Sequence, residues 1–324
     1  MTTLVADAEA SDPRCYVTAD ELKSLYVLCP WRIASDLALD WLWILAAIAA
    51  WGWSRHPLAL GCAFVIVASR QHALNNWVHE AAHYSLTRNK ALNDWLSDAF
   101  AATPHFISTA DYRAKHIPHH SYLGDPHKDT ELKSRFLITG SHLWKRVLIT
   151  LLGGVAWQTL HTYTDRMPID APRGARARYG VLMVTSNSLL ALWAWHWGAP
   201  LSWFYLWALP LVTLTPLLAT LRVIAEHQSV EYAAAGHEQF DQPLAPAITR
   251  TIETSRLTAF LLAPVNFNFH FVHHAWPAIP YTSLPALSQL LSAGGYYQRN
   301  PQFYGRSYAA VLAQLMAPTV SSTA

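Results

Sequence analysis

The sequence predicts an all-α integral membrane protein, and three observations support that prediction. Hydrophobic residues make up 52% of the 324 residues, charged residues make up only 14%, and the mean hydropathy is +0.13. Soluble domains carry about 25% charged residues, so this chain has too few charges to cover a water-facing globule of its size. Four segments are apolar and long enough to cross a bilayer as helices. These segments fall into two pairs, each joined by a short link.

The four predicted spans form two helical hairpins. They cover residues 37–53, 58–78, 178–197 and 201–221. Ser54 to Pro57 join the first pair and Gly198 to Pro200 join the second. Links this short place consecutive helices antiparallel, so all remaining polar chain lies on one side of the membrane.

One face of the predicted membrane domain carries nearly all the basic residues. Of the 23 Lys and Arg residues only Arg55 lies in a short link, and this asymmetry is typical of a cytoplasmic face. We therefore expect a cytosolic segment over 1–36 and a single membrane domain over 37–324. Its cytosolic helical cap comprises 79–177 and 222–324. The polar start of the chain lacks the apolar core of a signal peptide, and the predicted location is a bacterial plasma membrane with both termini cytoplasmic.

Two further apolar stretches are too short to cross the bilayer easily. Residues 147–160 and 257–269 span 14 and 13 residues, and the second stretch contains Pro264. We interpret both as helices that lie in the membrane interface or cover the cytosolic domain. Residues 165–178, which carry four arginines and two prolines, are interpreted as a solvated loop.

Histidine is the residue type whose number and spacing stand out. The chain has 17 histidines, and three clusters have the spacing of metal ligands: His79 and His83; His116, His119 and His120; and His270, His273 and His274. Side chains three or four residues apart lie on one face of a helix, where they can bind the same metal ion. Chance is a poor explanation for two HxxHH strings and one HxxxH string. We expect His72, seven residues before His79, to pack or hydrogen-bond rather than bind metal.

The predicted topology brings all three clusters to one side of the membrane. The first leaves the second span, the second precedes the third span, and the third follows the fourth. His227 also follows the fourth span, and an ionisable group at that depth is costly unless it is used. Nine imidazoles are too many for one tetrahedral zinc and suit two metal ions. Pro118 fits a helix only in its first turn, so we expect His116 to lie in a loop entering that helix.

These strings resemble the histidine boxes of the integral-membrane fatty acid desaturase superfamily, which also contains hydroxylases and carotenoid ketolases. The resemblance covers residues 70 to 285: RQHAL leads into HEAAH, HIPHHSYLGDPHKD resembles the second box, and FHFVHHAWPAIPYTSLPAL resembles the third. The first box has three residues between its histidines, where stearoyl-CoA-type enzymes have four. The third begins with histidine, where front-end desaturases have glutamine. No fused cytochrome b5 motif is present, so the resemblance implies a separate electron donor.

The resemblance implies that nine histidines hold two iron ions. These are His79, His83, His116, His119, His120, His227, His270, His273 and His274. Neutral imidazole is a suitable ligand for iron. We expect Glu80, Glu226 and Asp129 to accept hydrogen bonds from ring N–H groups and so to orient the ligands. Asn266 and Asn268 are better explained as turn residues than as holders of a metal-bound water.

The implied activity is an O2-dependent oxidation of an unactivated CH2 group. We expect desaturation of a fatty acyl or lipid-like chain, and the alternative is hydroxylation or ketolation of a lipid or carotenoid. The substrate would be a free lipid, an acyl-CoA or an acyl carrier protein, and the donor a ferredoxin, a rubredoxin or a cytochrome b5. Arg113, Lys115 and Lys128 could meet an acidic headgroup, although contact with lipid phosphates explains them equally well. With a net charge of only +2, no nucleic-acid partner is expected.

Two other classes of protein compete with this interpretation. HEAAH also satisfies HExxH, the zinc protease motif with two histidine ligands and a glutamate base. An intramembrane protease, however, leaves both HxxHH clusters without a role. Glu80→Gln would abolish a protease, and His270→Ala would be harmless to it. A non-enzymatic scaffold or transporter leaves all three clusters unexplained.

Overall fold

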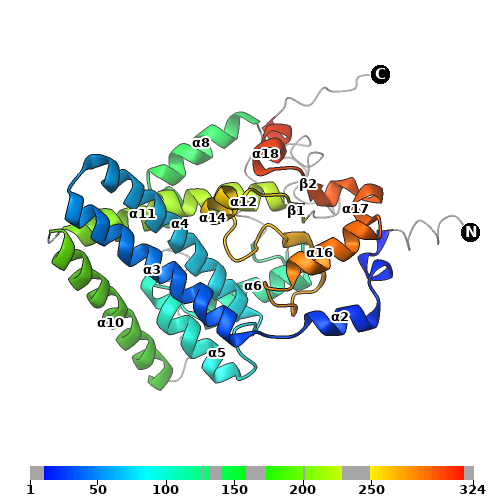
Figure 1. The fold of residues 1–324 in the computed structure, drawn as a ribbon, viewed down its shortest axis with the longest axis horizontal. Coiled ribbons are helices and arrows are strands. Elements are labelled where there is room, and N and C mark those ends of the chain that lie inside the picture. The colour runs from blue at the N-terminus through cyan, green and yellow to red at the C-terminus, as the bar shows by residue number, and fades with distance from the viewer. Residues whose placement is uncertain are drawn as a thin grey trace, which may run out of the picture.

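The protein is predominantly helical, which confirms the predicted all-α class (Figure 1). The computed structural model describes residues 11–125, 127–131, 140–157, 173–199, 201–227 and 249–316. Its α-helices are α2 (Ala19–Leu25), α3 (Pro30–Ser54), α4 (Pro57–Ala82), α5 (Lys90–Ser97), α6 (Thr109–Ser121), α8 (Gly140–Leu151), α10 (Arg173–Trp197), α11 (Leu209–Val212), α12 (Leu214–His227), α14 (Arg256–Leu262), α15 (His270–Ala275), α16 (Leu284–Ala293), α17 (Tyr296–Arg299) and α18 (Tyr308–Met316). Short 3-10 or π turns are η1 (Pro13–Tyr16), η2 (Asp98–Ala102), η3 (Thr103–His105), η4 (Phe204–Ala208) and η6 (Pro301–Phe303). Strands β1 (Thr251–Ile252) and β2 (Tyr304–Gly305) pair in parallel.

Three helical segments in the described part of the chain are long and apolar enough to cross a membrane. They are α3, α4 and the run Phe204–His227, which joins η4, α11 and α12. These segments correspond to the first, second and fourth predicted spans and identify a membrane protein. The third predicted span lies in α10, which is not one of the three, and the polar residues 185–188 interrupt its apolar run. A count of four spans is therefore not confirmed.

Two loop and interface predictions need correction where the structure describes them. α10 begins at Arg173, so the predicted loop over 165–178 is wrong for its last six residues, and residues 165–172 lie outside the described part. α8 begins at Gly140, seven residues before the predicted interface helix over 147–160, of which 158–160 are not described. Its outer face exposes Trp144, Leu148 and the following Leu152, a pattern typical of a helix in the membrane interface.

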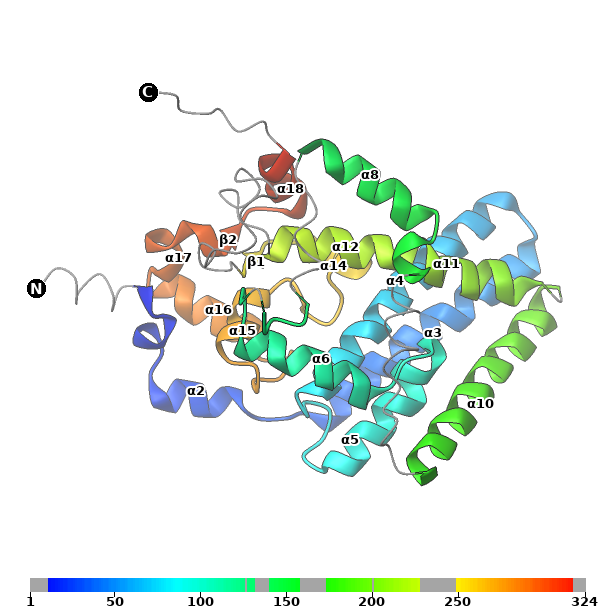
Figure 2. The ribbon, with the colours of Figure 1, turned by 180° about the vertical axis from the view of Figure 1, so that it is seen from behind.

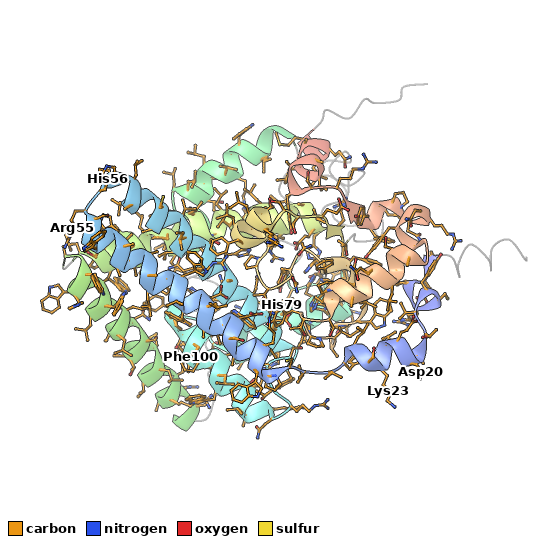
Figure 3. The ribbon with its side chains drawn as sticks, in the orientation of Figure 1. Asp20, Lys23, Arg55, His56, His79 and Phe100 are labelled. Atoms are coloured by element: carbon orange, nitrogen blue, oxygen red, sulfur yellow. The ribbon has the colours of Figure 1, made fainter. Side chains whose placement is uncertain are left out.

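Helices α3 and α4 lie side by side and turn at Arg55 (Figures 1 and 3). Arg55 has the left-handed φ of 53°, and its guanidinium donates to the carbonyls of Trp197 and Gly198 at 3.0 and 2.6 Å. His56 then caps the start of α4, because its Nδ1 accepts from the amide of Leu58 at 3.2 Å. The turn thus also fixes the end of α10 against α3.

Gly52 marks the closest approach of α3 to α10. A Cβ atom at Gly52 would lie 2.3 Å from the carbonyl oxygen of Trp197, a distance that real contacts do not reach. We expect Gly52→Ala to lower the free energy of unfolding by about 1–3 kcal/mol, since overpacking forces backbone shifts. Thermal unfolding in detergent measures this. Gly61→Ala is the matched control, because nothing lies within 4 Å of its added Cβ; equal melting temperatures for the two variants would contradict the prediction.

The second half of α4 buries polar side chains inside the predicted spans. Arg70 pairs with Asp40 of α3 through Nη1 and Oδ1 at 2.7 Å, and Trp77 donates to the other Asp40 oxygen at 2.8 Å. Gln71 donates to the carbonyl of Trp207 at 2.9 Å and accepts from the hydroxyl of Thr215 at 2.7 Å. These bonds satisfy polar groups that lipid could not, and they tie α4 to both neighbouring segments.

The same face of α4 holds α14 and the turn after it. Arg70 donates to the carbonyl of Phe260, the His72 Nε2 lies 3.1 Å from the carbonyl of Leu262, and Asn76 donates to that of Pro264 at 2.9 Å. His72 therefore packs and hydrogen-bonds, as predicted. The single helix expected over 257–269 is wrong, since α14 ends at Leu262, two residues before Pro264. A residue before proline disfavours helical geometry.

Candidate metal centre

The nine predicted histidines lie together, although they come from four helices that are separate in sequence. His79 is on the last turn of α4 with His83 just after it, and Figure 3 places His79 in the interior of the molecule. The remaining seven come from α6, α12 and α15. Figure 2 shows α6 and α15 side by side with α12 above them. Four elements that are distant in sequence therefore meet around one point.

Five of the imidazoles form a first histidine group. Their ring nitrogens all lie within 4.8 Å of one another, and the members are His79, His83, His116, His120 and His273. The Nε2 of His120 lies 2.9 Å from that of His116 and 3.2 Å from that of His273. Each of the three predicted clusters contributes at least one member, so the group exists only in the folded chain.

The other four imidazoles form a second histidine group beside the first. The ring nitrogens of His119, His227 and His274 lie within 4.8 Å of one another. The Nε2 of His270 lies 2.6 Å from that of His227 and 3.1 Å from that of His274. The rings of His120 and His274 stack across the two groups, with centroids 4.0 Å apart. Every imidazole in both groups is one of the nine predicted from the sequence.

The nitrogens in these groups fit metal ions. Buried Nε2 atoms of His79 and His83 have no hydrogen-bond partner within the described residues. The Nδ1 of His116 contacts a carboxylate at 2.9 Å, which makes it the protonated nitrogen and leaves its Nε2 as a lone pair facing His120. Lone pairs of neutral imidazoles gathered this closely repel one another, and a cation between them removes that repulsion. Buried imidazole nitrogens that have no hydrogen-bond partner are suitable metal ligands.

The environment also keeps the rings in the neutral form that binds metal. Burial, and after it repulsion among neighbouring imidazolium charges, lowers the pKa of four histidines outside the membrane segments: His83, His120, His273 and His274. Burial disfavours the charged form of a base, and so does each nearby positive charge. Protons therefore do not compete with a metal ion at neutral pH.

The three predicted carboxylates all lie behind histidine rings. The Oε1 of Glu80 is 3.3 Å from the Nδ1 of His79, and an Asp129 oxygen is 3.0 Å from the Nδ1 of His119. Glu226 is less close, with 3.7 Å between its Oε2 and the Nδ1 of His270, which is an ion-pair distance rather than a hydrogen bond.

Sequence reasoning missed a fourth carboxylate and the residues that hold Glu226. Glu131 accepts from the Nδ1 of His116 at 2.9 Å, and its place two residues after Asp129 was the available signal. Arg222 and the hydroxyl of Tyr308 each donate to Glu226 at 2.6 Å. Burial, and then the adjacent Glu226 carboxylate, raises the pKa of Tyr308, so its phenol keeps the donated proton.

The predicted start of the second cluster is wrong in one respect. Pro118 lies inside α6, which begins at Thr109, so His116 is helical and not in a loop. Ser108 caps the helix by accepting from the amide of Asp111 at 3.1 Å. Proline removes the amide donor to the carbonyl of Ala114, and the next carbonyl, that of Lys115, accepts from the hydroxyl of Thr130. Tertiary contacts therefore support a helix that local rules disfavour.

The asparagines before the third cluster are occupied by backbone carbonyls. The amide of Asn266 donates to the carbonyl of Tyr281 at 3.1 Å, and that of Asn268 donates to Ile252 at 2.9 Å. Asn266 and the preceding Val265 both have left-handed φ values, 53° and 62°. These bonds support their interpretation as turn residues.

Comparison with known proteins agrees with this site. Residues 52–306, which include all nine histidines, match the fatty acid desaturase family. The chain belongs to the fatty acid desaturase family. Together with the three apolar segments, this makes the protein a membrane oxidoreductase of that family.

Relatives of this desaturase-family protein differ in the activities that their names describe. A dihydrorhizobitoxine desaturase of Bradyrhizobium elkanii is 26% identical over 313 residues, covering 87% of this chain and 83% of the relative. The human sphingolipid delta(4)-desaturase/C4-monooxygenase DES2 is 26% identical over 299 residues, with 90% and 78% covered. A zeaxanthin 4-ketolase of Chlamydomonas reinhardtii is 25% identical over 267 residues, covering 82% of this chain and 49% of the ketolase.

Proposed function

We propose that the protein uses two iron ions, O2 and external electrons to desaturate an aliphatic chain of a lipid-like substrate. The observation that carries the proposal is the convergence of nine imidazoles into two adjoining groups. The names of two relatives include desaturation, and the family match covers the whole site. The first histidine group would hold one iron and the second group the other. Iron, when bound, supplies the one-electron chemistry with O2 that amino-acid side chains lack.

The chain's own residues supply placement and protection. Three carboxylates accept from the Nδ1–H of a histidine and so leave its Nε2 free to face the group: Glu80 behind His79, Asp129 behind His119 and Glu131 behind His116. Glu226 takes the same position behind His270. Burial of His79, His119 and His273 excludes water from the ligands. Desaturation removes two hydrogens from adjacent carbons. These two hydrogens, together with two external electrons and two protons, reduce O2 to two water molecules.

A hydroxylase or ketolase is the second candidate, supported by the ketolase and the monooxygenase named among the relatives. In hydroxylation one C–H hydrogen is replaced by a hydroxyl group, and the second oxygen leaves as water. The substrate is a free lipid, an acyl-CoA or an acyl carrier protein, and the donor is of the ferredoxin, rubredoxin or cytochrome b5 type. The basic residues on one face favour four spans with the site and both termini on the cytoplasmic side of a bacterial inner membrane.

The position of Glu80 argues against an intramembrane zinc protease. In an HExxH protease the glutamate is a base that acts on the metal-bound water. Here one Glu80 oxygen lies behind His79 at its Nδ1, and the other accepts from the backbone amide of Tyr281 at 3.3 Å. Both oxygens are therefore used on the side of the ring away from the orphan Nε2 of His79.

The test is product analysis of cells that express the protein with a reductase and a ferredoxin. Loss of two hydrogens from a lipid identifies desaturation, gain of one oxygen identifies hydroxylation, and gain of an oxygen with loss of two hydrogens identifies ketolation. We expect the first product, two irons per purified chain, and no activity in His270→Ala. One zinc per chain and full activity in His270→Ala would overturn the proposal in favour of a protease.

A further inference from the structure

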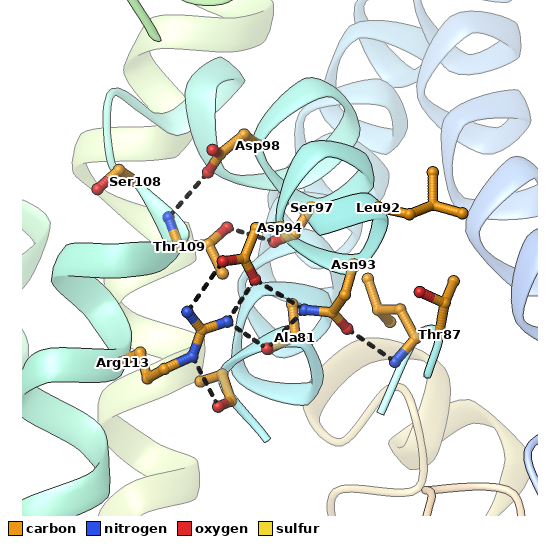
Figure 4. Close-up of polar contacts among 12 residues, drawn as sticks. Ala81, Thr87, Leu92, Asn93, Asp94, Ser97, Asp98, Ser108, Thr109 and Arg113 are labelled. Atoms are coloured by element: carbon orange, nitrogen blue, oxygen red, sulfur yellow. Dashed lines mark hydrogen bonds and ion pairs between the residues drawn. The ribbon is translucent and has the colours of Figure 1, made fainter. Parts of the chain in front are cut away.

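Arg113 connects the first two histidine clusters without being a ligand itself. It lies on α6, one turn before His116, and its side chain reaches the end of α4 between His79 and His83. Its Nε donates to the carbonyl of Ala82 at 3.0 Å, and its Nη2 donates to that of Ala81 at 2.8 Å. Figure 4 shows the guanidinium between Asp94 and the Ala81 carbonyl.

These carbonyls belong to the last turn of α4, where they lack the i+4 amide partner of a helix interior, and that of Ala81 accepts from the amide of Tyr84 at 3.0 Å instead. α4 ends at Ala82, and Tyr84 turns the chain away with a left-handed φ of 57°. The last carbonyls of a helix carry partial negative charge and favour a cation. The amide of Asn93 also donates to Ala81 at 2.9 Å, so α5 shares in the same cap.

The other side of the guanidinium is fixed as firmly. Nη1 and Nη2 donate to the two oxygens of Asp94 at 3.1 and 2.5 Å, and the guanidinium carbon lies 4.0 Å above the ring of Tyr84. The Arg113 side chain is only 16% exposed. All three of its nitrogens donate to groups of the protein, which leaves it poorly suited to the headgroup contact considered above.

We propose that Arg113 is a positioning residue that sets the distance of His79 and His83 from His116. The inference rests on the proposed function, because it assumes that the first histidine group binds metal. Three of the five members of that group lie within one helical turn of the bonds that Arg113 makes. The second histidine group takes only His119 from this region, and no bond of Arg113 reaches the α12 or α15 residues that supply its other members.

Arg113→Lys tests the inference, because lysine keeps the charge and loses the planar fork that reaches two carbonyls and Asp94 together. The probe is Co²⁺ titrated into purified metal-free protein, with the metal's visible absorption and the bound metal as readouts. We expect two metals per wild-type chain. In the variant we expect a roughly 10- to 100-fold weaker affinity at the first group and an unchanged second group, the range found when partners behind metal ligands are lost.

Two further variants separate positioning from folding. Arg178→Lys is the matched control, because Arg178 pairs with Asp98 at 3.2 Å, next to this network, and makes no bond to α4. Its titration should equal that of wild type. Asp94→Asn keeps the size of the side chain and leaves the bonds of Arg113 to α4 in place. We therefore expect a smaller loss of metal affinity at the first group. This variant tests the inference even if Arg113→Lys does not fold.

The outcomes distinguish this inference from the function on which it rests. Wild type that binds no metal overturns both proposals. Wild type that binds two metals, with unchanged affinities in Arg113→Lys and Asp94→Asn, overturns only the positioning role. Equal weakening of both metals in the variants also overturns it, since that result is expected of a general loss of stability.

Discussion

His227→Ala is expected to abolish product formation and to release one of two irons, leaving the first histidine group loaded. The Nε2 of His227 lies 2.6 Å from that of His270, and its ring is buried at the end of α12. Alanine leaves three imidazoles in a group that has four, and its methyl side chain cannot bind a metal ion. The proposed reaction uses both irons, so complete loss of activity is expected although half the metal remains. Iron analysis and product mass measure the two effects.

His196→Ala is the control for His227→Ala. His196 is an exposed residue near the end of α10 and belongs to neither histidine group. It should keep two irons and full activity. Retention of two irons by His227→Ala would show that His227 is not a ligand, whatever its activity.

Asp40→Ala is expected to lower the free energy of unfolding by about 3–5 kcal/mol. The substitution leaves the Arg70 guanidinium buried inside the predicted spans without its carboxylate, and breaking one partner of a buried pair costs this much. Arg70 also binds the carbonyl of Phe260, so α14 should loosen as well. Thermal unfolding in detergent is the measurement.

The double variant Asp40→Leu with Arg70→Met should recover most of that loss, because it removes both charges and fills the space. Arg32→Ala breaks an exposed pair with Asp36 on the same helix and should change stability by less than about 1 kcal/mol. A double variant as unstable as Asp40→Ala would mean that the pair itself does not account for the effect.

Residue spacing was enough to find eight of the nine histidines that the structure brings together, whereas His227 was predicted from its place at the end of an apolar segment. Histidines three or four positions apart lie on one helical face, and three of the four segments predicted from apolar length are also long apolar helical segments in the structure. The same local reasoning failed at Pro118, where a proline rule was outweighed by contacts made after residue 121. It failed again at α14, where Pro264 set the helix end and α4 supplied partners for the exposed carbonyls.

Partners that are distant in sequence left no signal. Tyr308 lies 82 residues after Glu226 and belongs to a helix with no motif of its own, so nothing along the chain indicated their 2.6 Å bond. Arg113 was visible as a basic residue, but its contacts with Ala81 and Asp94 depend on how three helices meet. Spacing identifies groups that share one helix, whereas supporting contacts are properties of the packed fold.

Both histidine groups combine residues from the first half of the chain with residues from its last third. The first needs His273, and the second needs His119 as well as His227. When a ribosome has synthesised the first two thirds of the chain, five of these nine histidines have been made. Both groups still lack at least one member at that point. The order of synthesis thus means that neither group can form until α12 and α15 have been made and have packed against α4 and α6.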